Sequence, residues 1–272
     1  MNPPVSPDTP EPGTVAPSGT AALSLRGLTK RFGATVAVDR LDLDVPAGSL
    51  FGLVGPNGAG KTTTLSMATG LLRPDAGTAV VQGVDVWADP VAAHRLLGVL
   101  PDGLRTFDRL TGPELVEYTG RLHGLPAAEA RRRAAELLDV MDLASAGRTL
   151  VVDYSAGMRK KVGLACALVH APRVLVLDEP FEAVDPVSAT TLRALLQRFV
   201  AGGGTAVVSS HVMQLVEQLC DHVGIIVGGR VVAAGHVAAV RAGGTLEERF
   251  VSLAGGARDV GGDLSWLAPS PR

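Results

Sequence analysis

The chain has 272 residues, with 25 Lys and Arg against 27 Asp and Glu, which gives a formal net charge of -2. At this length we expect one large domain or two small ones with a sizeable core. The near-neutral charge argues against a broad basic surface, so we expect no nucleic-acid partner. The sequence contains no uncharged apolar run of about 18 residues, so we expect no membrane-spanning helix.

Both ends of the chain have a composition typical of disorder. Residues 1–22 are rich in Pro, Ser, Thr and Gly, and residues 255–272 are again rich in Gly, Pro and Ser. Such segments cannot bury enough apolar surface to offset the entropy lost on ordering. We therefore expect a disordered tail over 1–22, a folded domain over 23–254 and a flexible tail over 255–272.

The first strong motif follows a short apolar run, Leu50–Val54, which we expect to be a strand. The next residues, GPNGAGKTT, satisfy the phosphate-loop pattern G-x-x-x-x-G-K-[ST] between a strand and a helix. In such a loop the backbone N–H groups surround phosphate oxygens, and the helix N-terminus adds positive potential. Lys61 can reach the β- and γ-phosphates, and the Thr62 hydroxyl can bind Mg²⁺. The predicted phosphate-binding residues are Gly55, Pro56, Asn57, Gly58, Ala59, Gly60, Lys61, Thr62 and Thr63.

The middle of the chain, from about residue 91 to 170, shows no strand signal. Thr111 and Glu114 fit a capping box, which predicts a helix start. The apolar residues that follow recur at helical spacing on one face: Leu115, Tyr118 and Leu122. We therefore expect an inserted helical subdomain over about 91–170.

An acidic pair follows the next apolar run, Val174–Leu177. Asp178 and Glu179 would lie at the carboxyl edge of a buried strand, where ligands bind in open α/β sheets. Asp178 suits Mg²⁺ coordination at one remove, through a bound water, and Glu179 can polarise the water that attacks the γ-phosphate.

A helix and two further apolar runs complete the pattern. The helix begins after Asp185, an expected N-cap, and the runs are Thr205–Ser209 and Gly224–Val227. His211 follows the first of these runs, so it would approach the same sheet edge and contact the γ-phosphate, although a histidine after a strand is often only structural. Continuous apolar runs alternating with helical segments predict an α/β fold.

These motifs, in this order, resemble the nucleotide-binding subunit of an ATP-binding cassette (ABC) transporter over about residues 23–253. The resemblance implies a phosphate-loop NTPase cassette with a mixed or parallel core sheet, an N-terminal antiparallel β subdomain and an inserted α-helical subdomain. It implies an ATPase that uses ATP and Mg²⁺ and dimerises head-to-tail. Lys61, Glu179 and His211 would then be its catalytic residues.

Further elements are similar to those of the family. The stretch DYSAGMRKK looks like the signature loop, in which Ser155 and Gly157 would cap the γ-phosphate bound by a second subunit. Asp185, in FEAVDP, looks like the dimer-contacting aspartate. Phe32, in KRFG, occupies the place of an aromatic that stacks on adenine, with a strand-core phenylalanine as the alternative.

Three residues depart from the family pattern. Ala156 replaces the first signature glycine, and Met158 replaces the usual glutamine of that loop. Asp102 stands where another glutamine is expected; it can reach Mg²⁺ or a water, or it can be a turn residue of the Pro-Asp-Gly triplet. These departures leave open a weakly catalytic, regulatory nucleotide binder.

Two stretches, RLTGPELVEYTGRLHGLP and TLEERFVSLAGG, resemble one branch of the family. That branch pairs cytoplasmic ATPases with a separate polytopic permease in exporters of drugs, antibiotics, polysaccharides or peptides. The resemblance implies a homodimer at the cytoplasmic face of the membrane. The alternative is a soluble ABC ATPase without a transport role.

Overall fold

The computed structural model describes residues 21–103, 107 and 109–255. Most of the two predicted tails, residues 1–20 and 256–272, lies outside the described residues. The first strand begins at Ala21, two residues inside the predicted N-terminal tail, because its backbone already pairs with Pro46. In the described ranges, every helix is too short or too polar to cross a membrane.

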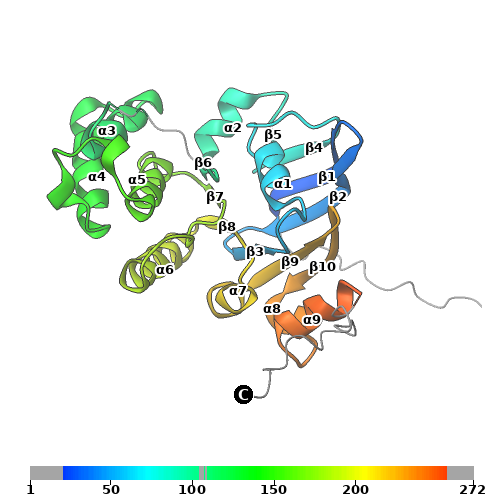
Figure 1. The fold of residues 1–272 in the computed structure, drawn as a ribbon. Helices are drawn as coiled ribbons and strands as arrows, with labels where there is room; N and C mark the ends of the chain where they lie inside the picture. Colours follow the sequence, from blue (N-terminus) through cyan, green and yellow to red (C-terminus); the bar gives the residue numbers. More distant parts are fainter. Residues whose placement is uncertain (1–20, 104–106, 108, 256–272) are drawn as a thin grey trace, which may run out of the picture.

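Two sheets form the body of the molecule (Figure 1). The first is antiparallel, in the order β2-β1-β4-β5, and its strands are β1 (Ala21–Phe32), β2 (Thr35–Pro46), β4 (Ala76–Val81) and β5 (Val84–Asp85). The second has the order β10-β9-β3-β8-β7-β6. Its strands are β3 (Leu50–Val54), β6 (Leu97–Leu100), β7 (Val174–Leu177), β8 (Thr205–Ser210), β9 (His222–Val227) and β10 (Arg230–His236).

The second sheet is mixed. Strands β9, β3, β8, β7 and β6 run parallel, and only β10 pairs antiparallel, with β9. Strands β3, β7 and β8 are buried along their whole length, as their continuous apolar sequences predicted. One core lies between the two sheets around α1 (Lys61–Ala68), and the other lies on the opposite face of the mixed sheet. The α/β architecture with an antiparallel N-terminal sheet is thus confirmed.

The helical region lies to one side of both sheets (Figure 1). It contains α3 (Gly112–Leu122), α4 (Ala127–Val140), two short 3₁₀ turns, η1 (Ala144–Ala146) and η2 (Val151–Asp153), and α5 (Ala156–Leu168). The remaining helices are α2 (Pro90–Leu96), α6 (Pro186–Ala201), α7 (Met213–Leu219), α8 (Val237–Arg241) and α9 (Leu246–Leu253). Thr111 and Glu114 form the predicted capping box at the start of α3.

The structure differs from the sequence-based expectation in two places here. Strand β6 lies inside the range 91–170, which showed no strand signal, because its four residues follow α2 with no turn between them. Its pairing with β7 decides its conformation, and that contact is not local in sequence. On α3, Leu115 is buried but Tyr118 and Leu122 are exposed, so the expected apolar face is only partly used in the core.

Two histidines stack where the helical region meets the mixed sheet. His123 caps the C-terminus of α3, and its ring centroid lies 3.7 Å from that of His170. The His170 Nε2–H donates to the Leu97 carbonyl oxygen at 3.0 Å. Burial, with positive charge on His123 and Arg133 nearby, lowers the pKa of His170 to about 4. His170 is therefore neutral at pH 7 in the folded protein.

We expect acid to destabilise the wild type more than a His170→Gln variant, which keeps a donor for Leu97 but does not titrate. The folded state lowers the pKa of His170 from 6.5 to about 4, so the unfolded chain binds the proton more readily. Stability is therefore lost as pH falls from about 6.5 to about 4. Because the ring is partly exposed, we expect a difference of about 1–2 kcal/mol. Chemical denaturation at about pH 7 and pH 4.5 measures it, and equal losses in both proteins would contradict it.

Candidate active site

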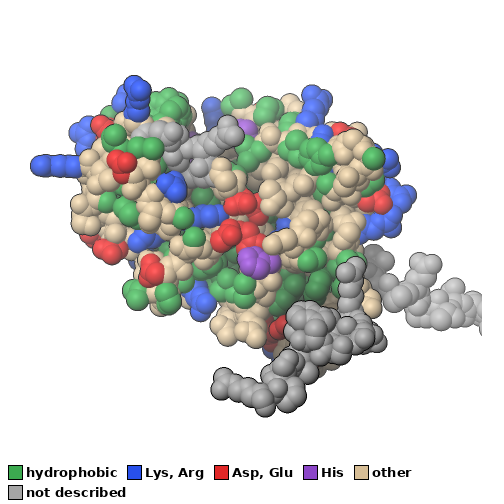
Figure 2. Space-filling model, in the orientation of Figure 1, with side chains coloured by type: hydrophobic (Ala, Val, Ile, Leu, Met, Phe, Trp, Pro, Cys, Tyr) green, Lys and Arg blue, Asp and Glu red, His purple; other side chains and the backbone are tan. Residues whose placement is uncertain are grey.

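A pocket of about 460 Å³ opens where the parallel strands of the mixed sheet end. Residues 56–63, which follow β3, line it, together with Asp102 after β6, Glu179 and Glu182 after β7, and His211 after β8. Figure 2 shows acidic side chains and a histidine gathered near the centre of this face. The topology therefore brings the three predicted catalytic positions, Lys61, Glu179 and His211, into one cavity.

The loop between β3 and α1 depends on glycine. Gly58 and Gly60 adopt left-handed conformations, with φ of 78° and 104°. A Cβ on Gly60 would also fall 2.5 Å from the Ala37 carbonyl oxygen, so this position admits no side chain. The loop thus curls tightly at the N-terminus of α1, whose free N–H groups can bind an anion. The cradle fits a phosphate chain.

Lys61, the first residue of α1, is buried beneath this loop. Its Nζ donates to the Gly55 carbonyl oxygen at 2.7 Å and to the Pro56 carbonyl oxygen at 3.3 Å. The loop itself therefore holds the ammonium group against the pocket. Gly55 does not line the cavity but supplies one of these carbonyl groups.

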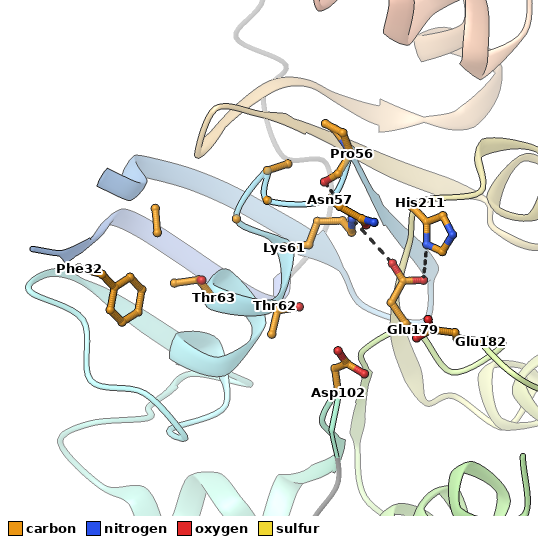
Figure 3. A pocket seen from close by; sticks show the side chains of 14 residues that line it. Phe32, Pro56, Asn57, Lys61, Thr62, Thr63, Asp102, Glu179, Glu182 and His211 are labelled. Atoms are coloured by element: carbon orange, nitrogen blue, oxygen red, sulfur yellow. Dashed lines mark hydrogen bonds and ion pairs between the residues drawn. The ribbon is translucent and has the colours of Figure 1, made fainter. Parts of the chain in front are cut away.

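A chain of three charged or titratable groups crosses the pocket (Figure 3). The Glu179 Oε1 lies 3.7 Å from the Lys61 Nζ, and its Oε2 lies 3.1 Å from the His211 Nδ1. A carboxylate oxygen is an acceptor, so we assign the donating N–H of this contact to the His211 Nδ1. Its Nε2 is the nitrogen that can act on a ligand. The carboxylate is thereby oriented from both sides at the wall of the cavity.

The backbone of Glu179 is itself unusual. Its φ is +47°, in the left-handed region that side chains other than glycine rarely adopt. Its N–H donates to the Ser209 Oγ at 2.8 Å, which holds the turn in place.

Ser209 was not predicted from the sequence, although it orders both acidic residues. Its hydroxyl donates to the Asp178 Oδ1 and accepts from the Glu179 N–H. Asp178 is buried behind the pocket and does not line it. The sequence signal that could have indicated its role is the run TAVVSSH, in which two serines precede a histidine at a strand end.

The oxygen donors at the pocket fit a magnesium ion. The Thr62 hydroxyl and the carboxylates of Asp102, Glu179 and Glu182 line the same cavity, with Asp178 behind it. Among the described residues, no three acidic, histidine or cysteine side chains are grouped to hold a metal by themselves. That arrangement suits Mg²⁺, which commonly binds one or two protein carboxylates with waters and substrate phosphates.

Phe32 lies at the other end of the pocket from Glu179 (Figure 3). It ends β1 with 52% of its surface exposed, so the strand-core alternative is wrong. The Lys30 Nζ lies 5.8 Å from the ring centroid. An exposed aromatic face at the end of a polar cavity is available for stacking on a planar base.

The signature-loop residues are not brought into this pocket. Ser155 is exposed at the N-cap of α5, where its Oγ accepts from the Met158 N–H at 3.2 Å. Gly157 packs against the Ala183 backbone, and Asp185 is the exposed N-cap of α6. None of the three lines the cavity.

Comparison with known proteins agrees with this geometry. The family model described as "ABC transporter" matches residues 38–182, more than half of the chain. The chain belongs to the ABC transporter family. An ATP-binding subunit of an ABC transporter has the same fold, with a TM-score of 0.80 and 29% identity over 86% of this chain and 99% of that one. The protein is therefore an ATP-binding cassette of this family.

Several curated relatives of this cassette are named for resistance or export. It is 42% identical over 79% of its length to the daunorubicin/doxorubicin resistance ATP-binding protein DrrA of Streptomyces peucetius. Identity is 34% over 78% of the chain to the linearmycin resistance ATP-binding protein LnrL of Bacillus subtilis. The chain is 40% identical over 79% of its length to the Nod factor export ATP-binding protein I of Ralstonia nicotianae. The chain spans about two thirds of these relatives, 66% of DrrA, 68% of LnrL and 67% of the Nod factor protein.

Proposed function

We propose that this cassette binds and hydrolyses ATP with Mg²⁺ to power a separate polytopic permease, in an exporter at the cytoplasmic face of the membrane. The observation that carries the proposal is the carboxylate of Glu179, set between Lys61 and His211 in the pocket of the phosphate loop. A base oriented beside a phosphate site suits hydrolysis by water.

The roles of the residues follow from their places. The backbone of residues 55–63 would bind the phosphates, with Lys61 at the β- and γ-phosphates and Phe32 against adenine. Thr62 and Asp102 would hold Mg²⁺, and Asp178, behind the pocket, would act on it through a bound water. When bound, the ion neutralises charge on the phosphate oxygens. Glu179 would orient a water and take its proton. The His211 Nε2 would contact the γ-phosphate and keep that water in line.

A second copy of the chain would complete each site. Ser155, Gly157 and Asp185 are outside the pocket, and Ser155 and Asp185 are exposed at helix starts, whose free N–H groups suit an anion. In a head-to-tail homodimer, Ser155 and Gly157 of one copy would cap the γ-phosphate bound by the other. Closure around two ATP molecules would then move the permease, and hydrolysis would reset the pair.

Exposed apolar side chains on the helical region support a permease partner. Phe107 and Tyr118 pack edge to face with their centroids 5.5 Å apart, yet both are exposed, as is Leu122. Such a group suits contact with another protein. The relatives named for resistance to daunorubicin, doxorubicin or linearmycin favour a drug or antibiotic as the exported substrate.

Purification of the tagged chain from gently solubilised membranes tests this function. We expect a polytopic permease to co-purify, and the complex to hydrolyse ATP. A soluble partner, or a protein that stays in the cytosol alone, would contradict the transport role and favour the non-transport ATPase. ATP binding with a turnover near zero would contradict the enzymatic role and favour a regulatory nucleotide binder.

A further inference from the structure

Lys160 connects the signature helix to two loops at the edge of the pocket. It lies in the second turn of α5, and its side chain is only 14% exposed. Its Nζ lies 3.4 Å from the Asp102 Oδ1, after β6, and donates to the Asp178 carbonyl oxygen at 3.3 Å, after β7. One ammonium group thus bridges the helical region and two strand ends of the mixed sheet.

Asp102 faces the pocket while it is paired in this way. It lines the cavity, and Figure 3 shows its carboxylate directed toward the space between Thr62 and Glu182. Its side chain is 47% exposed, so its single long contact with Lys160 is a weak one. A divalent cation entering with phosphates can therefore compete for the same carboxylate.

Acidic side chains outnumber lysines around the pocket, so each lysine changes how strongly the site attracts a cation. Four carboxylates lie at or just behind the pocket: Asp102, Asp178, Glu179 and Glu182. Two lysines contact them, Lys61 at Glu179 and Lys160 at Asp102. Lys160 itself does not line the cavity, so its side-chain contact with the residues that do is the one to Asp102.

We propose that Lys160 is a positioning residue that competes with Mg²⁺ for the Asp102 carboxylate and so sets the Mg²⁺ concentration at which nucleotide is bound. The proposal rests on the proposed function, since it assumes ATP in this pocket. The proposal also accounts for the pairing of Lys160 with Asp102: an aspartate carries a charge that a lysine can neutralise, whereas the glutamine usual in the family is neutral. The arrival of Mg²⁺ would loosen the tie between Asp102 and the start of α5.

The test is a titration with Mg²⁺ of fluorescent ATP-analogue binding to the full-length protein, without hydrolysis as a readout. We expect Lys160→Gln to lower the half-saturating Mg²⁺ concentration about threefold to fivefold, because Asp102 loses its competitor. Lys160→Arg restores the cation and should stay within about twofold of the wild type. Asp102→Asn should raise the half-saturating concentration.

The double variant separates a direct contact from a general change of charge. In the Asp102→Asn background, Lys160→Gln should shift the half-saturating concentration by less than about twofold. Arg26→Gln, which removes a cation paired with Asp44 in the antiparallel sheet, is the matched charge control and should leave it unchanged. Thermal unfolding of each variant checks that it folds.

The outcomes are distinct. An equal shift in both backgrounds, or no shift with Lys160→Gln, would overturn the role of Lys160 while leaving ATP binding intact. Absence of nucleotide binding by the wild type, at any Mg²⁺ concentration, would contradict the proposed function and this inference together.

Discussion

Replacing Glu179 by Gln should lower ATP hydrolysis by at least about 100-fold and leave ATP binding within about threefold of the wild type. Glutamine has the shape of glutamate but cannot accept a proton from water, and loss of a general base typically costs 10²–10⁴-fold in rate. The His211 contact at 3.1 Å and the Lys61 contact at 3.7 Å hold the carboxylate where that base is needed.

Glu182 provides the matched control for this experiment. It lines the same pocket, but no ion pair joins it to Lys61 or His211 among the described residues. Glu182→Gln should therefore reduce turnover by less than about tenfold. Steady-state phosphate release measures hydrolysis, and fluorescent-nucleotide titration measures binding. Unchanged turnover in the Glu179→Gln variant would remove this residue from the mechanism.

Replacing Lys61 by Met should weaken ATP binding by about 10- to 100-fold. Charge-assisted hydrogen bonds contribute about 1.5–3 kcal/mol each, and the ammonium is already held by the loop carbonyls of Gly55 and Pro56 at the phosphate cradle. Methionine keeps much of the buried volume, so the loss reports the charge and not a cavity. Equilibrium titration with a fluorescent ATP analogue measures it.

Lys161 is the natural control for Lys61. It is also a buried lysine, 8% exposed against 6% for Lys61, but its Nζ donates to the Ser188 hydroxyl away from the pocket. Lys161→Met should leave ATP affinity within about threefold, whatever it does to stability. If both substitutions weakened binding equally, the effect would come from burial and not from a phosphate contact.

Local sequence patterns predicted much of this fold and the central residues of the candidate site. The loop 55–63 contains its own glycines, lysine and helix start, so its conformation follows from neighbouring residues. Strands β3, β7 and β8 are recognisable because they are buried on both sides. Parallel strands end at a common edge, so Lys61, Glu179 and His211 could be expected to converge there.

What the sequence could not predict depends on contacts between distant segments. Strand β6 is short and follows a helix directly, so only its pairing with β7 reveals it. Ser209 and Lys160 matter through bonds to residues 31 and 58 positions away, respectively. The exposure of Tyr118 and Leu122 likewise follows from where α4 and α5 pack, which helical periodicity does not specify.

The left-handed backbone at Glu179 places folding and activity in conflict at one residue. A side chain in this conformation costs about 1–2 kcal/mol that glycine would not incur. Selection for stability alone would therefore favour glycine here, whereas the proposed hydrolysis needs the carboxylate. A lineage of this cassette that ceased to work as an ATPase should drift toward glycine or asparagine at position 179 and gain thermal stability as it did so.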